Sequence, residues 1–192
     1  CALPIYDFAY MNPYHFTVFN RTPGYRAMVR EANKRIQGIV VVRKDSALQS
    51  IEGLRERTVA FPAPAAFAAS VLPRAQFRSA ALRVTPKYVS SHDSVYRAVA
   101  KGLVPAGGGI NRTFSKVDQA IRNQLRILWR TERYTPHAIA HHPDVPDDVS
   151  NRLRQALMTL SEDETGRKFL AALGFRDRKS TRLNSSHQII SY

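Results

Sequence analysis

The chain has 192 residues and a formal net charge of +14, from 29 lysines and arginines against 15 aspartates and glutamates. Hydrophobic residues make up 44% of it, enough for the core of one domain or part of a two-lobed one. No apolar run approaches the roughly 18 residues of a membrane-spanning helix, and a single cysteine excludes an internal disulfide. The positive excess attracts anions. The arginines are scattered and form no basic run, which argues against nucleic acid as a partner.

Both ends differ in character from the rest of the chain. It begins at Cys1 and enters strand-like sequence at once, which favours an internal cysteine exposed by truncation over a lipidated one, because a lipidated cysteine normally precedes a flexible tether. At the other end, DRKSTRLNSSH has no helical period and resembles the read-through of a sequencing adapter. We therefore expect residues 177–192 to be a non-native tail, with a disordered native tail as the alternative.

The first half of the chain predicts a strand at 5–11, a turn at 11–16, a helix at 23–35, a strand at 38–42 and a short helix at 45–54. In the 23–35 helix Tyr25, Met28, Val29 and Ala32 would share one face. The β-branched run GIVVV at 38–42 is typical of a strand buried on both sides. Asp45 and Ser46 would cap the short helix.

The second half predicts strands at 58–61, 84–89, 104–107, 125–129 and 138–141, and helices at 65–79, 91–101, 114–123, 146–160 and 164–173. Pro73 predicts a kink or break inside the 65–79 helix, and Gly102 ends the 91–101 helix. Strands that alternate with helices are typical of parallel βαβ units, so the sequence indicates an α/β fold.

Three strand-to-helix junctions are candidate ligand sites, because ligands of α/β proteins bind where strands end. The first, FPAPAAFAAS at 61–70, has almost no polar side chains. Its main-chain amides at the helix start could bind an anion. Alternatively, its small residues serve only to let the helix pack closely on the sheet. In the second, SSHDS at 90–94, His92 is either an anion donor or a solvent-exposed residue beside a helix cap. The third, GGGINRTF at 107–114, offers close backbone approach and Arg112, but lacks the dinucleotide spacing.

Several blocks in order, YDFAYMNPYHF, GIVVVRKDS, TVAFPAPAAFAASVLPRA, YVSSHDSVYRAVAKGL and TPHAIAHHP, together resemble the phosphate/phosphite/phosphonate solute-binding proteins of ABC importers. The resemblance covers residues 1–176. It implies an α/β type II periplasmic-binding-protein fold, truncated at the N-terminus, with one nearly complete lobe plus part of the other. In this interpretation the segments are the end of lobe 1 (1–35), a crossing strand and hinge (36–57), lobe 2 (58–124), and return strands with C-terminal helices that pack on lobe 1 (125–176).

The resemblance also implies a set of ligand contacts. Similar proteins carry a Ser-Thr-Ser cluster at the first junction; counting back from Pro73 places it on Ala66, Phe67 and Ala68, so that only main-chain donors remain. The family places a ligand-contacting histidine at His92. Amine-binding members carry acidic residues near Arg112 and in the TPHAIA segment, so we expect a ligand without a cationic amine. The candidate ligand-binding residues are Asn12, Tyr14, Ala66, Phe67, Ala68, Ser91, His92, Arg112, Tyr134 and His137, with burial of Tyr14 in the core as its alternative role.

The implied function is that of a periplasmic, monomeric solute-binding component of an ABC importer. Its ligand would be a small oxyanion of the phosphate, phosphite or phosphonate class, its partner an ABC permease, and it would need no cofactor. The alternative is a ligand-sensing input domain of a signalling or transcription-regulatory protein with the same fold. An enzyme is not expected, since no Ser-His-Asp set has a glycine elbow. A metal site is not expected either, because His141 and His142 would point to opposite faces of a strand.

Overall fold

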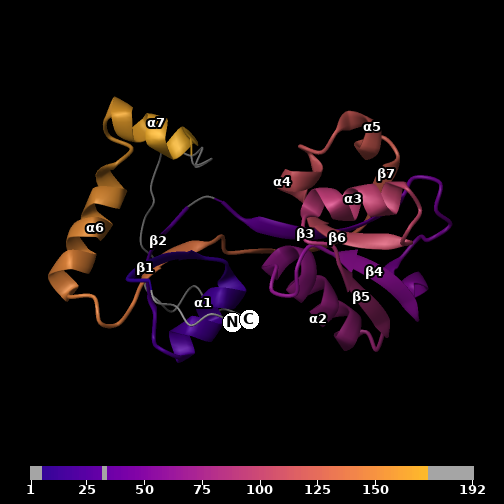
Figure 1. The fold of residues 1–192 in the computed structure, drawn as a ribbon, viewed down its shortest axis with the longest axis horizontal. Coiled ribbons are helices and arrows are strands. Elements are labelled where there is room, and N and C mark those ends of the chain that lie inside the picture. The colour runs from indigo at the N-terminus through magenta and orange to yellow at the C-terminus, as the bar shows by residue number, and fades with distance from the viewer. Residues whose placement is uncertain (1–5, 32–33, 173–192) are drawn as a thin grey trace. The chain divides into compact units, whose positions relative to one another are not determined.

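The computed structural model describes residues 6–31 and 34–172 (Figure 1). The chain divides into unit 1, which comprises 1–35 and 135–192, and unit 2, which comprises 36–134. The expectations for Cys1 and for the 177–192 tail lie outside the described residues. Within the described ranges, no helix is both long enough and apolar enough to cross a membrane.

Unit 2 is built on a five-stranded sheet with the order β5–β4–β6–β3–β7. Its strands are β3 (Ile36–Arg43), β4 (Arg57–Phe61), β5 (Val84–Tyr88), β6 (Ala106–Ile110) and β7 (Leu125–Tyr134). β4 pairs in parallel with β5 and β6, whereas β3 pairs antiparallel with β6 and β7. The sheet is therefore mixed, with the expected parallel βαβ arrangement confined to β4, β5 and β6.

Helices cover both faces of this sheet (Figure 1). α3 (His92–Ala100) packs with Ile39 and Val41 of β3, whereas α2 (Leu72–Ser79) and the short η1 (Ile51–Leu54) pack with Val40 and Val42. These four residues of β3 are fully buried, because successive side chains of a strand point to opposite faces and both faces are covered. Burial stabilises the fold by roughly 1.5–3 kcal/mol for each such side chain. The prediction of a strand buried on both sides is confirmed.

The predicted 65–79 helix is broken, as Pro73 indicated. A π-helical turn, η2 (Phe67–Val71), comes first, and the N–H of Val71 reaches back five residues to the carbonyl of Ala66 (3.1 Å). α2 then begins at Leu72, with Pro73 in its first turn. Proline has no N–H to donate to the preceding turn, which places the change of helix type at this point.

Two other short helices differ from the prediction. The 45–54 helix reduces to η1, since Ser46 accepts only a weak bond from the N–H of Leu48 (3.3 Å). The 114–123 helix is replaced by α4 (Asn111–Phe114) and α5 (Gln119–Arg122), because Asp118 accepts the N–H of Ala120 (2.7 Å) and starts a new helix. The three glycines of the third junction lie inside β6 and not in a loop, so the strand predicted at 104–107 is displaced toward the C-terminus.

Unit 1 contains a three-stranded antiparallel sheet with the order β1–β8–β2. Its strands are β1 (Phe8–Met11), β2 (Arg26–Arg30) and β8 (Ala138–His141), and its helices are α1 (Pro13–Arg21), α6 (Asp147–Thr159) and α7 (Glu164–Ala172). A small core forms where Phe16 of α1 meets Met11, Tyr25 and Ala140. The strand at 138–141 and the last two helices agree with the prediction in the described range.

Two predictions in unit 1 are wrong. The turn at 11–16 is the start of α1, in which Asn12 accepts the N–H of His15 (2.9 Å) and Pro13 takes the first helical position. The helix at 23–35 is replaced by β2, and its residue Ala32 lies outside the described residues. β2 has a register shift between Ala27 and Val29, so its burial does not alternate and imitates the helical period.

Candidate functional site

The carboxyl ends of β4, β5 and β6 lie at one edge of the unit 2 sheet, because these three strands run parallel. Each is followed by a helix start: η2 at Phe67, α3 at His92 and α4 at Asn111. The antiparallel partners β3 and β7 also reach this edge, where Ile36 pairs with Tyr134. We call it the carboxyl edge. Seven of the predicted ligand residues lie at it: Ala66, Phe67, Ala68, Ser91, His92, Arg112 and Tyr134.

The start of η2 offers main-chain donors and no polar side chain. Ala66 is its N-cap and makes no side-chain capping bond, and the first amides of a helix have no partner within it. The side chains of Phe67 and Ala68 are buried, and the Phe67 ring meets that of Tyr134 edge-on at 5.6 Å. These residues can therefore contribute amides, while their side chains belong to the packing of η2.

Close packing accounts for the small residues of this junction. A Cβ on Gly38 would lie 1.9 Å from the carbonyl oxygen of Ala68, and one on Gly108 would lie 2.1 Å from that of Ala69. η2 thus lies with its backbone directly against β3 and β6. The helix–sheet packing interpretation of FPAPAAFAAS is therefore supported by the geometry, and it leaves the amides at the helix start compatible with an anion.

The start of α3 is capped by Ser91, whose Oγ accepts the N–H of Ser94 (3.0 Å). Asp93 does not cap it and instead accepts a bond from Nε of Arg97 (2.6 Å). His92 is the first residue of the helix and is half-buried; its Nδ1 is buried and, among the described residues, has no hydrogen-bond partner. Burial lowers the pKa of His92 below its ordinary value. A neutral imidazole that carries one unused nitrogen at a helix start suits recognition of an anion.

Tyr96 secures the start of α4. Its buried hydroxyl accepts the N–H of Ile110 (3.2 Å) and contacts Oγ1 of Thr113 (2.7 Å). A Cβ on Gly109 would lie 2.2 Å from this hydroxyl, so the third glycine of the junction gives room to Tyr96. None of the three glycines has a positive φ, so close approach and not a left-handed conformation accounts for them.

Three polar side chains form a continuous hydrogen-bonded path across the carboxyl edge. This path was not predicted from the sequence. Nη1 of Arg130 donates to Oδ1 of Asn111 (2.5 Å), and Nδ2 of Asn111 donates to Oε1 of Gln37 (2.9 Å). Arg112 and Arg130 are both exposed and bring two guanidinium groups to the elements of this edge. The sequence could have indicated only Asn111, which directly follows a strand. Gln37 of β3 and Arg130 of β7 reach this edge through antiparallel strand pairing.

The remaining three candidates belong to unit 1. Asn12 is the N-cap of α1, and Tyr14 is 40% exposed on the same helix, so its alternative role as a core residue is wrong. His137 stacks on Tyr10, with ring centroids 5.1 Å apart. Met11 pairs with Ala138, so Asn12 and His137 lie at the same edge of the unit 1 sheet.

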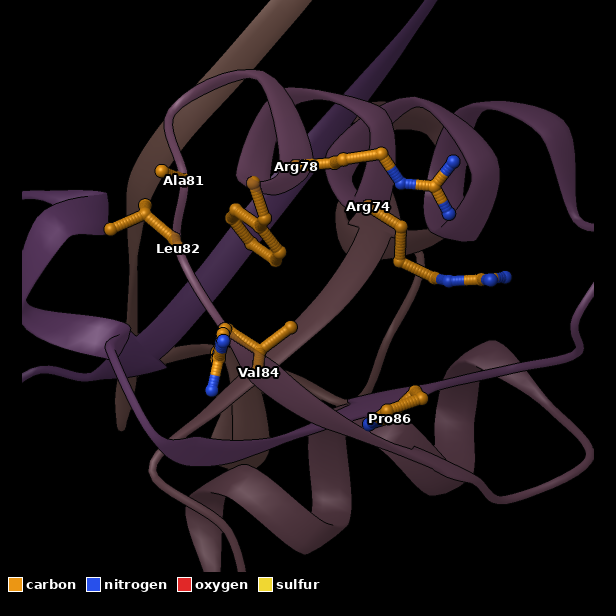
Figure 2. Close-up of a pocket in the computed structure, with 8 residues that line it drawn as sticks. Arg74, Arg78, Ala81, Leu82, Val84 and Pro86 are labelled. Atoms are coloured by element: carbon orange, nitrogen blue, oxygen red, sulfur yellow. The ribbon is translucent and has the colours of Figure 1, made fainter.

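Two further observations bear on the site. Within the described residues, no group of three or more His, Cys, Asp or Glu is placed to hold a metal ion. A cavity in unit 2 lies between α2 and the amino end of β5, away from the carboxyl edge, and none of the predicted ligand residues lines it (Figure 2).

The sequence model of a family described as "ABC transporter, phosphonate, periplasmic substrate-binding protein" matches residues 5–183. The chain belongs to this family. The family expected from the ordered sequence blocks is thereby confirmed. It is a family of transporter substrate-binding proteins and not of enzymes, in agreement with the expectation drawn from the sequence. Comparison with curated proteins gave no match.

Solved structures with the same fold include a Xanthomonas citri protein, XAC2383, bound to chloride (TM-score 0.85, 17% identity, 95% of this chain and 74% of that one). PhnD1 from Prochlorococcus marinus in complex with methylphosphonate gives a TM-score of 0.75 at 17% identity, with the same coverage. A binding-protein component of a phosphonate transporter from Pseudomonas aeruginosa gives 0.69 at 16% identity, over 87% of this chain and 61% of that one. At such identities the likeness shows the fold, and it confirms the expected type II periplasmic-binding-protein class.

Proposed function

We propose that this protein is the periplasmic solute-binding component of an ABC importer, and that its ligand is a small phosphorus oxyanion of the phosphonate, phosphate or phosphite class. The observation that carries the proposal is the arrangement of the carboxyl edge. There, the start of η2 presents main-chain N–H groups, and the start of α3 places the half-buried ring of His92, whose buried Nδ1 has no hydrogen-bond partner among the described residues. Membership of the phosphonate-binding family supports the phosphorus class.

In this proposal the oxyanion accepts hydrogen bonds from the amides of Phe67 and Ala68 and from the His92 ring. Backbone N–H groups at a helix start bind anions without hydroxyl side chains, because the helix dipole adds positive potential there. Ser91 fixes the start of α3, and Tyr134 fixes the Phe67 ring. In this proposal main-chain amides at the start of η2 take the place of the hydroxyl donors of the Ser-Thr-Ser cluster, which this chain lacks.

Cations at the same edge restrict the ligand further. Arg112 and Arg130 are exposed on α4 and β7, and α4 itself (Asn111–Phe114) contains no acidic residue. An ammonium group on the ligand would be repelled by these two guanidinium groups, and the carboxylate of Asp93 at the start of α3 is already paired with Arg97. We therefore assign the site to oxyanions that lack a cationic amine. PhnD1 from Prochlorococcus marinus, which binds methylphosphonate, supports this choice of ligand class.

Asn12, Tyr14 and His137 are the candidate ligand contacts that belong to unit 1. Transport requires that ligand binding favours the conformation that the permease recognises, so bound ligand must contact that conformation better than the other. We propose that the protein acts as a monomer with an ABC permease as its partner.

A ligand panel tests the proposal by isothermal titration calorimetry. We expect methylphosphonate, phosphite or phosphate to bind at least about tenfold more tightly than 2-aminoethylphosphonate, a difference of 1.4 kcal/mol. Tight binding of 2-aminoethylphosphonate with no heat from the other three would refute the assignment. The variant His92→Gln should weaken the preferred ligand, whereas Arg154→Gln, an exposed arginine of α6 in unit 1, should leave its affinity unchanged.

A further inference from the structure

Unit 2 contains a cavity of about 430 Å³ that runs along α2 to the connection after it. It is lined by α2, by the connection that follows it and by the start of β5 (Figure 2). Arg74 and Arg78 extend from α2 to the same side, and Val84 and Pro86 of β5 lie across from them (Figure 2). Arg83 is the third arginine of the lining. This arginine cavity is separate from the carboxyl edge, because the chain enters β5 here and leaves β5 there.

The side chains that line the arginine cavity carry positive charge only. Its lining contains three arginines and no acidic residue. Elsewhere in the described chain, arginines such as Arg43, Arg97 and Arg152 pair with aspartates, whereas none of the cavity arginines makes an ion pair with a described residue. Like charges four positions apart on a helix, as at 74 and 78, repel each other unless an anion lies between them.

The floor of the cavity is apolar. Phe77 and Leu82 are buried members of the unit 2 core, and Val84 and exposed Pro86 continue this surface on an edge strand. The volume lies in the range of about 300–1,000 Å³ that is typical of small-molecule sites, which is more space than a lone oxyanion needs. A ligand that fits would place an apolar group on this floor and its negative charge among the guanidinium groups.

We propose that the arginine cavity binds a small organic phosphate, with a phosphate or polyphosphate group held by Arg74, Arg78 and Arg83 and an apolar ring against Val84 and Pro86. Guanidinium groups bind phosphate through paired, planar hydrogen bonds, and three of them favour a ligand with more than one negative charge over a monocarboxylate. The site is additional to the oxyanion site and does not depend on it.

The test uses 1-naphthyl phosphate as the probe on the full chain, with binding followed by its fluorescence. The double variant Arg74→Gln/Arg78→Gln should lower the affinity at least about tenfold, since each lost bond to a charged group weakens binding substantially. The control Arg133→Gln/Arg154→Gln removes the same charge from two exposed arginines outside the cavity and should change the affinity less than about twofold. Arg78, Arg133 and Arg154 are exposed and Arg74 is half-buried, and melting temperatures check that all variants are folded.

Two comparisons define the ligand class and separate this site from the oxyanion site. Inorganic phosphate should compete at least about tenfold more weakly than the probe, because it leaves the apolar floor unused. His92→Gln should leave probe binding unchanged. The proposal is overturned if the probe does not bind, if the control pair weakens it as much as the cavity pair, if inorganic phosphate competes equally, or if His92→Gln abolishes binding.

Discussion

The partly buried His92 should make the free energy of unfolding depend on pH. Burial lowers its pKa below the ordinary value of 6.5, so the folded protein binds this proton less readily than the unfolded chain. Between pH 6.5 and the lower folded pKa, the unfolded chain carries more protons, and the free energy of unfolding therefore rises with pH. Below the folded pKa both states are protonated, and this contribution to stability has been lost.

We expect the variant His92→Gln to lose the part of the pH dependence that arises in this window. Urea unfolding at intervals from about pH 5 to pH 7.5, the range in which histidines titrate, measures it. His15, which lies on α1 in unit 1 and outside the carboxyl edge, offers a control histidine. The account fails if His92→Gln retains the full pH dependence, or if NMR titration places the His92 pKa above 6.5.

Tyr96 supports the site through its hydroxyl. Replacing it with phenylalanine would leave the N–H of Ile110 and the hydroxyl of Thr113 without this partner in a buried region. We expect Tyr96→Phe to lower the free energy of unfolding by about 1–3 kcal/mol, because two hydrogen bonds in a largely buried region are lost. The exposed Tyr88 is the control, and Tyr88→Phe should change stability by less than about 0.5 kcal/mol. Equal effects of the two changes would contradict a specific role for the Tyr96 hydroxyl.

The contact between η2 and the sheet is the feature of secondary structure on which the candidate site most depends. Gly38 of β3 and Gly108 of β6 leave space for the carbonyl oxygens of Ala68 and Ala69. Backbone atoms cannot rotate out of the way as a side chain can. A methyl group at either glycine must therefore push η2 away from the sheet and move the amides that we assign to the ligand.

We expect Gly38→Ala and Gly108→Ala each to destabilise the protein by about 1–3 kcal/mol, the usual cost of overpacking, and to weaken oxyanion binding as well. Gly53→Ala is the control, since its Cβ would meet only the end of the flexible Leu48 side chain (2.7 Å). Chemical unfolding and calorimetry measure the two effects. Wild-type stability and affinity in Gly38→Ala would show that η2 does not lie as close to β3 as described.

The sequence predicted those secondary-structure elements whose signals are local. β3 has a β-branched run, α3 has the Ser91 cap and ends before Gly102, and η2 is separated from α2 at Pro73. β2 was missed because its register shift buries Met28 and Val29 together, and because its pairing with β8 joins distant parts of the chain. No local pattern distinguishes this case from an amphipathic helix.

In the candidate site, too, features with a local sequence signal were predicted, and features that depend on the pairing of distant segments were missed. The three junctions were predicted because parallel strands bring their carboxyl ends to one edge. The chain from Arg130 through Asn111 to Gln37 was missed because Gln37 and Asn111 lie 74 positions apart and meet only through antiparallel pairing. The arginine cavity was missed because Arg74, Arg78 and Arg83 form no pattern in the sequence. They come together only when α2 packs against β5.

At the scale of the whole molecule, charge is the dominant property. The chain carries a net charge of +14, and ion pairs engage several of its few acidic residues, including Asp45, Asp93 and Asp148. The field around the protein is therefore positive and attracts anionic ligands from solution. Because the Debye length falls from about 30 Å at 0.01 M to about 3 Å at 1 M ionic strength, salt should remove this long-range attraction while leaving contacts in the bound state largely intact.

We therefore expect the association rate constant of the preferred oxyanion to fall at least about tenfold between 0.01 M and 1 M salt, and the dissociation rate constant to change much less. Stopped-flow fluorescence with a reporter on the protein measures both. Chloride is itself an anion and can occupy an oxyanion site, so sodium chloride is compared with sodium gluconate at equal ionic strength. Screening predicts the same slowing in both salts; slowing by chloride alone would mean competition for the site, and an unchanged rate in both would mean that the net charge does not guide the ligand.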